Sequence, residues 1–288
     1  MKHDKVILLS AAMALAGAAS AIAQAQSTTP PPKVLVVTRE FVKPGKTGMP
    51  HQKTESAFVQ AMARAKWPTH YFAMTSLSGE SRALFLVGYD SFDAWDRDNH
   101  ATMNDKPLSA ELDRAAVADG ELLSSMDQSV WVFNPDLSLN PAVDIAHMRL
   151  MEVDVVQVKP GHHDQAEELC KVYIRGYQNI PDAHWATYES AYGGADRVAF
   201  FIPMKSGTEI DAGFAQGKNF EAALGKDGMK KLHELEADSL ESTMGNLFSF
   251  EPAMSYPPDE WVKADPGFWK VKPVPMAKKP EAMKSNTE

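Results

Sequence analysis

The stretch Val42-Lys43-Pro44-Gly45 recurs later in the chain as Val158-Lys159-Pro160-Gly161. In both places a run rich in β-branched residues precedes it, and a segment with helical periodicity follows it. Further pairs recur in the same order, 114 to 118 residues apart, including His70-Tyr71-Phe72 with His184-Trp185-Ala186 and Phe133-Asn134-Pro135 with Phe250-Glu251-Pro252. One short match arises by chance, but an ordered series of them indicates an internal duplication.

Each copy predicts the same order of elements. Val34–Val42 and Leu150–Val158 predict opening strands, because a Pro-Gly pair ends each of them. A helix follows, and in the second copy Ala166, Cys170, Tyr173 and Tyr177 form its apolar stripe. Two strands around a glycine turn, a helical stretch and a short last strand complete the unit.

This β-α-β-β-α-β order is the ferredoxin-like arrangement, in which both helices cover one face of an antiparallel sheet. The other face needs a partner, and a second copy can supply it. We therefore predict an α+β protein of two tandem ferredoxin-like units, residues 34–140 and 147–256, packed sheet to sheet.

The two ends of the chain differ from its centre in composition. Residues 1–23 combine a basic start with an Ala- and Leu-rich run, and Ala21-Ile22-Ala23 fits the small-x-small rule of signal peptidase. We read residues 24–33 as a linker and residues 263–288, rich in Pro and Lys, as a disordered tail. The sequence thus predicts a periplasmic or secreted protein with no membrane segment after signal cleavage.

Composition excludes several classes of function. The formal net charge of −9 opposes binding to a phosphate backbone, so nucleic acid is not an expected partner. Gly-rich phosphate loops, Gly-x-Ser-x-Gly elbows and Cys-x-x-Cys pairs are absent from the sequence. The single cysteine, Cys170, rules out an intramolecular disulfide, and no residue set predicts a metal site.

A family resemblance follows from these features. Tandem units with Pro-Gly after the first strand, and Ser91-Phe92-Asp93-Ala94-Trp95 before His100, resemble the dimeric α/β-barrel superfamily, in particular its antibiotic-biosynthesis monooxygenase and NIPSNAP-like branches. The resemblance implies a small ligand held between sheet and helices or inside the barrel. It also implies activities that range from cofactor-free and haem-degrading oxygenases and haem peroxidases to proteins without catalysis.

The opening strands carry unexpected carboxylates. In the second copy Met151, Val153 and Val155 alternate with Glu152 and Asp154. We expect the apolar set to face the helices, which directs the carboxylates of the two copies toward the space between the sheets, namely Glu40, Glu152 and Asp154. They predict a polar pocket with an acid/base or metal-binding group, or else a water-filled seam in which they pair with Arg or Lys.

Three histidines are further candidates. His70 and His184 occupy matching positions at the starts of strands. They are either ligands of a shared metal or haem iron or structural residues retained from the duplication. His100 lies where the resembling oxygenases often carry a functional histidine, but its polar neighbours also suit a solvent-exposed helix.

These observations lead to a leading functional hypothesis with two alternatives. The hypothesis is non-catalytic binding of a small molecule in a cleft between the repeats, lined by Glu40, His70, Glu152, Asp154 and His184, with His100 as a further candidate. The alternatives are a cofactor-free or haem-linked monooxygenase of the dimeric α/β-barrel type and an interaction protein without a pocket. The sequence names no cofactor and does not set the oligomeric state.

Overall fold

The structure is a computed structural model in which residues 28–194 and 196–270 are described. The predicted signal peptide, residues 1–23, lies outside the described residues, as does the end of the predicted tail, residues 271–288. No helix in the described part combines the length and the apolar character that a membrane span requires.

Eight antiparallel strands form one closed barrel in the order β1-β3-β2-β8-β5-β7-β6-β4. Each half of the chain contributes four neighbouring strands with the same internal order. The strands of the first half are β1 (Val34–Val42), β2 (Tyr71–Ser76), β3 (Arg82–Tyr89) and β4 (Leu123–Phe133), and those of the second are β5 (Leu150–Val158), β6 (Ala186–Tyr192), β7 (Arg197–Met204) and β8 (Leu240–Phe250).

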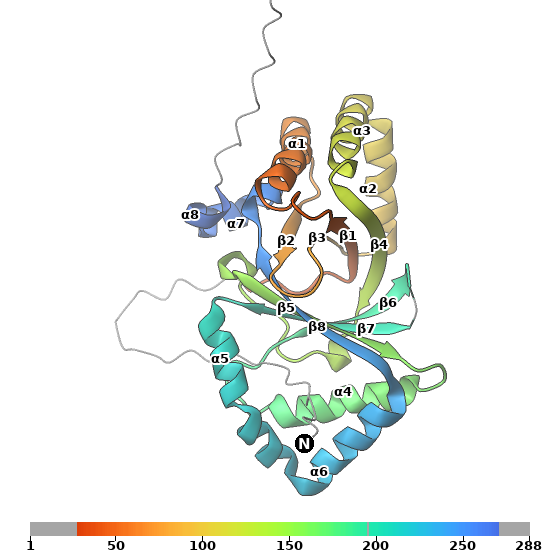
Figure 1. Ribbon diagram of the computed structural model, residues 1–288, viewed down its shortest axis with the longest axis vertical. Coiled ribbons are helices and arrows are strands. Elements are labelled where there is room, and N and C mark those ends of the chain that lie inside the picture. The colour runs from red at the N-terminus through yellow and green to blue at the C-terminus, as the bar shows by residue number, and fades with distance from the viewer. Residues whose placement is uncertain (1–27, 195, 271–288) are drawn as a thin grey trace, which may run out of the picture.

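Helices cover the barrel from two opposite sides (Figure 1). In the first half these are α1 (Met49–Ala65), α2 (Phe92–Asn104) and α3 (Lys106–Gly120), and in the second α4 (His163–Tyr177), α5 (Gly207–Ala215) and α6 (Gly217–Ser239). Two short helices, α7 (Asp259–Ala264) and α8 (Pro266–Trp269), follow the barrel, and the 3-10 turns are Pro135–Leu137, Ile145–His147 and Pro252–Met254. The mixed α+β class predicted from the sequence is confirmed.

The two sheets are joined at their edges as well as packed by their faces. β2 pairs with β8 through Met74–Ser76, and β4 pairs with β6 through Val130–Phe133. The sequence analysis predicted face-to-face packing alone. Edge pairing satisfies the backbone N–H and C=O groups that an open sheet would leave unpaired, so closure removes all four free edges.

The repeated Pro-Gly motif forms the same turn in both halves. Gly45 and Gly161 have φ values of 78° and 83°, in the left-handed region where glycine is favoured. The turns are closed by hydrogen bonds from the Lys46 amide to the Lys43 carbonyl and from the His162 amide to the Lys159 carbonyl, both of 3.0 Å. Proline before a glycine of positive φ is the pattern of a type II turn, and it ends β1 and β5 at the predicted residues.

The chain ends of the described part pack onto the barrel. The Thr29 amide donates to the Val143 carbonyl at 3.0 Å, so the predicted linker includes ordered residues. Trp269 is 3% exposed and its indole donates to the Ala146 carbonyl. The predicted disordered tail therefore does not begin at residue 263, because aromatic residues in a segment rich in Pro and Lys dock onto the barrel.

Aromatic side chains fill the space between the second half's sheet and its helices. Phe220 on α6 lies 4.6 Å from Tyr177 and 5.7 Å from Tyr173 between ring centroids. Gly176 on α4 faces the same ring, and a Cβ atom there would lie 2.2 Å from a Phe220 carbon. The absent side chain thus allows α4 and α6 to approach each other.

We predict that Gly176→Ala destabilises the fold by about 1–3 kcal/mol, because the held Phe220 ring cannot move away from the new methyl group. The measurement is the free energy of unfolding in urea. Gly207→Ala is the matched control, since nothing lies within 4 Å of that added Cβ, and it should be neutral or slightly stabilising. Equal effects of the two substitutions would contradict the packing argument.

Candidate functional site

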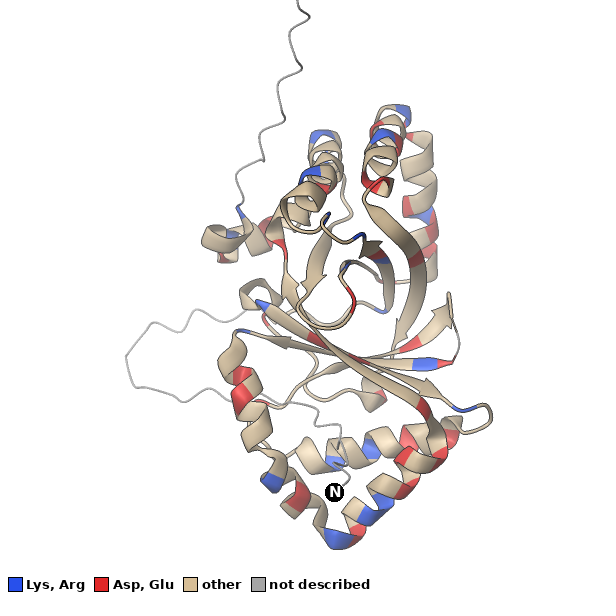
Figure 2. Cartoon of the chain, in the orientation of Figure 1, with Lys and Arg blue, Asp and Glu red and all other residues tan. Residues whose placement is uncertain are grey.

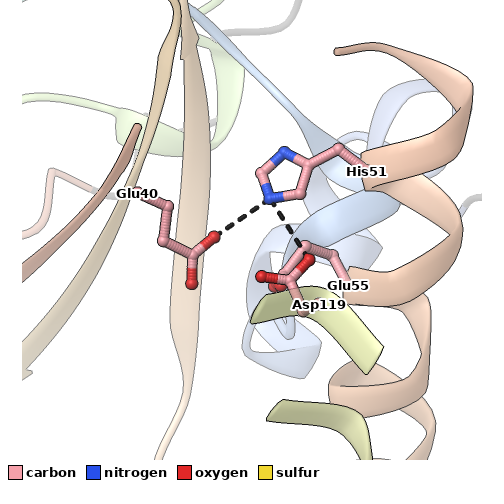
Figure 3. A group of neighbouring side chains, drawn as sticks. All are labelled: Glu40, His51, Glu55 and Asp119. Carbon is pink, nitrogen blue, oxygen red and sulfur yellow. Dashed lines mark hydrogen bonds and ion pairs between the residues drawn. The ribbon is translucent and has the colours of Figure 1, made fainter. Parts of the chain in front are cut away.

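Four buried polar residues gather between the first half's sheet and its helices (Figure 3). Glu40 lies near the end of β1, His51 and Glu55 lie one turn apart on α1, and Asp119 lies at the end of α3. None of the four is more than 7% exposed. We call these four residues the acidic cluster.

His51 links the carboxylates of the acidic cluster. Its Nε2 lies 3.0 Å from Glu40 Oε2 and 3.5 Å from Asp119 Oδ1. The Thr54 hydroxyl donates to the same Asp119 oxygen at 2.5 Å. Glu55 Oε1 is buried and has no hydrogen-bond partner among the described residues. One acceptor of the cluster is therefore available to a ligand.

Burial shifts the protonation equilibria of the cluster. It raises the pKa of Glu40, and the hydrogen bond with His51 partly offsets this rise. Burial, followed by the charges of Glu40 and Asp119, raises the pKa of Glu55 well above its ordinary value. Carboxylates with a raised pKa are stronger bases than exposed ones, so the cluster is suited to accept a proton.

The cluster borders a cavity of about 580 Å³ between the sheet and helices α1 and α3. The polar wall includes Thr38, Glu40, Glu55, Tyr71, Asp119, Ser124, Ser125 and Gln128, and the apolar wall includes Phe58, Met62, Phe85, Val87, Leu123 and Met126. The Tyr71 hydroxyl is buried without a partner among the described residues. An apolar cavity with a few convergent polar groups is the usual form of a small-molecule site.

The corresponding space in the second half is filled. The cavity between β5, β7 and α4 measures only about 20 Å³. Val156 occupies the strand position that matches Glu40, and the aromatic side chains around Phe220 occupy the helix side. Of these two spaces between a sheet and its helices, only the one in the first half therefore has room for a ligand.

Glu152 and Asp154 do not face the barrel interior, and this correction applies equally to Glu40. Met151 and Val153 pack inside the barrel with the inner residues of the other strands, whereas Val156 and Val158 pack against α4. Strand alternation was predicted correctly, but the faces were exchanged. The reason is that the closed barrel interior is itself an apolar core, so the apolar set points inward and the carboxylates point to the helices.

His70 and His184 do meet at one cavity, of about 250 Å³, at one end of the barrel. Their chemistry differs. Both ring nitrogens of His184 lie 2.7 Å from backbone carbonyl oxygens, those of Asp182 and Pro203. His70 stacks on Tyr256 with ring centroids 4.7 Å apart, and its Nδ1 is buried without a partner among the described residues.

His100 lies apart from every described cavity. It is exposed on α2 and its Nε2 is 3.6 Å from Asp96 one turn away. The six predicted residues are thus divided among the acidic cluster, the barrel-end cavity, the space beneath α4 and the surface of α2. A binding role for them stays a prediction, but they do not line a single cleft.

The sequence did not identify three residues of the acidic cluster, His51, Glu55 and Asp119. A usable signal was present, because His51, Glu55, Phe58, Met62 and Ala65 continue one stripe at helical spacing. Polar residues at two positions of an otherwise apolar stripe indicate a buried polar pair that faces the sheet. Asp119 had no comparable signal in the sequence.

The acidic cluster also has the donor set of a cation site. One ligand atom from each of its four residues lies within 4.8 Å of the others. Three oxygens and one imidazole nitrogen suit a divalent cation. Because burial raises the pKa of Glu40 and of Glu55, protons compete with a cation for this site.

The residues do not fit a haem, a cofactor implied by the family resemblance. The second half leaves about 20 Å³ between its sheet and α4. In the first half the large cavity is lined by the carboxyl groups of Glu40, Glu55 and Asp119, and by no imidazole of the described residues. His100 is exposed on α2, and both nitrogens of His184 are engaged by the backbone.

No family model and no curated protein sequence matches the chain. Several solved structures do match its fold. A candidate monooxygenase from Fusobacterium nucleatum superposes with a TM-score of 0.50 at 12% identity, covering 76% of this chain and 93% of its own. An anthrone oxidase-like protein gives a TM-score of 0.46 at 9% identity, with 76% and 91% covered. A mutant chlorite dismutase from Candidatus Nitrospira defluvii gives 0.44 at 11% identity, with 81% and 95% covered.

The chain has the fold of the dimeric α/β-barrel superfamily, with the whole barrel formed within one polypeptide. The resemblance inferred from the sequence is confirmed at the level of fold. Identities of this size show the architecture and leave the activity to the residues of the site.

We predict that Glu152 and Asp154 make the fold less stable as the pH rises. Burial raises their pKa values to about 8 and about 7, with the charge of Asp154 adding to the effect on Glu152. The folded state therefore holds more protons than the unfolded state from about pH 4 up to these values, and stability falls across that interval. Urea unfolding at pH 5 and pH 8 measures the fall.

The double variant Glu152→Gln/Asp154→Asn should lose this pH dependence and be more stable than wild type at pH 8 by on the order of 2 kcal/mol. Glu221→Gln, an exposed carboxylate on α6, is the control and should keep the wild-type slope. An unchanged slope in the double variant would show that these two carboxyls do not titrate as proposed.

Proposed function

We propose that the protein binds a small, mainly apolar molecule with one hydroxyl group in the first-half cavity, and that the acidic cluster takes the proton from that hydroxyl. A hydroxylated aromatic compound has this chemistry. The observation that carries the proposal is the pair of buried polar atoms without partners, Glu55 Oε1 and Tyr71 Oη, in residues that line a cavity of about 580 Å³. A buried polar atom left without a partner costs about 1–3 kcal/mol, which a bound hydroxyl would recover.

The arrangement supports proton transfer. A carboxylate of raised pKa, such as that of Glu40, is a suitable base for a phenol, and His51 lies within hydrogen-bond distance to pass or share the proton. The Tyr71 hydroxyl, from β2 on the far side of β3, is available to donate to the phenolate oxygen that forms. The apolar wall lowers the local dielectric constant and so strengthens these contacts.

Such a site also supports the cofactor-free oxygenase alternative. A phenolate is electron-rich, and it supplies the electrons for reaction with dioxygen. One oxygen atom replaces a ring hydrogen to give a quinone, the other leaves as water, and the substrate is the only reductant. The candidate monooxygenase from Fusobacterium nucleatum, which shares the fold, has a name compatible with this reaction. The residues of this chain favour it over the haem-linked one.

The proposal extends to the origin and location of the chain. We interpret the two halves as duplicated ferredoxin-like units, because their strand order and their Pro-Gly turns agree. We also propose that the mature chain is periplasmic or secreted, on the basis of residues 1–23. The second half then supports the barrel while the first half binds the ligand.

We predict that 4-nitrophenol binds to the first-half cavity and is held there as the phenolate. Its two protonation states absorb at different wavelengths, so titration with protein at a pH below the pKa of the free phenol should raise the phenolate band. Glu40→Gln should bind the probe without that band, because the base is lost, and Ala116→Trp should abolish binding by filling the cavity.

Asp113→Asn provides the matched control to Asp119→Asn. Both residues lie on α3, but only Asp119 belongs to the acidic cluster. Asp113→Asn should behave as wild type. A phenolate band that persists in Glu40→Gln and Asp119→Asn would overturn the assignment of the base. Oxygen uptake with a hydroxylated naphthalene, lost in Glu40→Gln, would establish the oxygenase activity.

We further predict that the exported chain lacks its first 23 or 25 residues when it is expressed in a bacterium. The two possible cleavage sites follow Ala21-Ile22-Ala23 and Ala23-Gln24-Ala25, which both fit the small-x-small pattern. Intact mass measurement of periplasmic protein tests this. Ala23→Arg alters both sites at once and should leave the chain uncleaved, whereas Ser27→Arg should be processed normally. Wild-type protein that keeps Met1 would contradict export by this route.

A further inference from the structure

A second cavity lies inside the barrel, at the end opposite the one lined by His70 and His184. Its volume is about 200 Å³. Charged residues are concentrated on the helices and are sparse on the strands (Figure 2), yet three arginines from the barrel strands line this cavity. They are Arg39 near the end of β1, Arg82 at the start of β3 and Arg197 at the start of β7.

We call this end of the barrel, lined by Arg39, Arg82 and Arg197, the arginine mouth. Its positive charges outnumber its negative ones. Arg39 forms a bidentate pair with Asp127, with both nitrogen–oxygen distances 2.7 Å. Arg82 and Arg197 form no ion pair with any described carboxylate. Within the described residues, the guanidinium hydrogen bonds of these two arginines reach only backbone carbonyls, those of Glu80 at 3.3 Å and Gly193 at 3.2 Å. Arg197 Nε is buried without a partner in the described part of the chain.

Arg82 and Arg197 are held in equivalent ways in the two halves. Arg82 lies over the Phe248 ring at 5.2 Å, and Arg197 lies over the Trp131 ring at 5.3 Å. Each ring comes from the last strand of the other half, so each contact spans one intervening strand at a seam between the halves. Stacking on a ring fixes the guanidinium plane and leaves N–H groups to bind an anion.

The arginines also disfavour one another. Burial, and then the charge of Arg39, lowers the pKa of both Arg82 and Arg197. An anion placed among the three would offset this repulsion. The remaining wall supplies polar atoms from Asn246, which is 8% exposed, and apolar surface from Val37, Leu84, Val153 and Phe201.

We propose that this mouth binds a dianionic phosphate monoester that carries a small apolar group. Three guanidinium groups, against the carboxylate of Asp127 and the more distant one of Glu80, leave a net positive charge that a dianion offsets. Guanidinium groups match phosphate oxygens in geometry, and the apolar wall accepts the attached group. This site is separate from the acidic cluster and does not depend on the proposed function of the first-half cavity.

The test is calorimetric titration of the full chain with phenyl phosphate at pH 7.5, where the ester is a dianion. Wild type should bind, and binding should weaken as sodium chloride is added. Arg82→Gln/Arg197→Gln should lose at least tenfold in affinity, and Asp127→Asn should gain severalfold because it removes the opposing charge. Arg64→Gln, which removes an arginine outside the barrel on α1, should leave the affinity unchanged.

Two further variants keep the result interpretable. Asn246→Asp places a carboxylate among the arginines, so it should fold with wild-type stability while it abolishes binding. Ala116→Trp should leave phenyl phosphate binding unchanged, because it fills only the first-half cavity. Binding that survives both Arg82→Gln/Arg197→Gln and Asn246→Asp would overturn the site, as would no binding by wild type.

The ligand class is tested with two other probes. Benzoate carries one charge and should bind at least tenfold more weakly than phenyl phosphate. Inorganic phosphate lacks the apolar group and should also bind more weakly. Equal affinity for benzoate would contradict the need for a dianion, and equal affinity for inorganic phosphate would contradict a role for the apolar wall.

Discussion

Closure of the barrel is the constraint on which the rest of the structure depends. Once β2 pairs with β8 and β4 with β6, the inward side chains of eight strands share one enclosed space. That space must be apolar at its centre, since water is excluded there. Polar residues on the strands are therefore restricted to two locations, the open ends of the barrel and the layer beneath the helices. Arg39, Arg82 and Arg197, with Asp127 as the partner of Arg39, occupy the first location. Glu40, Glu152 and Asp154 occupy the second.

The two halves use the layer beneath the helices differently. In the second half Tyr173, Tyr177 and Phe220 fill it, and the approach of α4 and α6 depends on the absence of a side chain at Gly176. In the first half the same layer holds the acidic cluster and a cavity of about 580 Å³. A cavity and buried carboxyls both cost stability. The filled second half and the continuous barrel supply the stability that lets the first half retain them.

Much of the fold could be predicted from the sequence, because the signals were local. The bounds of β1 and β5 follow from β-branched runs that end at Pro-Gly, and the α4 stripe through Cys170 is buried as expected. The direction of the strand faces could not be predicted in the same way. The alternation of apolar and polar residues along a strand specifies two faces. Only the closure of the barrel determines which of these faces lies in the more apolar environment.

The site was less predictable for a related reason. His51 and Glu55 acquire their character from Glu40 and Asp119, which come from two other elements and approach only when α1 and α3 pack on β1. The arginine mouth depends in the same way on distant pairs, such as Arg197 with Trp131. Each arginine alone suits a strand end at the surface, and their convergence is a product of the tertiary fold.

The separation of the two charged sites has an electrostatic consequence. The chain is acidic overall, with a formal net charge of −9, and its field repels anions at long range. Arg39, Arg82 and Arg197 reverse that field locally, within walls of low dielectric constant that reduce screening. In the acidic cluster the repulsion is between negative charges, since three carboxyls lie together without a paired lysine or arginine of the described residues. Protonation lowers this negative charge. Because β1 carries Arg39 and Glu40 as neighbours on opposite faces, one strand directs the two opposite charges to separate compartments. The sheet between them keeps these residues from neutralising each other, so each compartment retains its own capacity to bind a ligand.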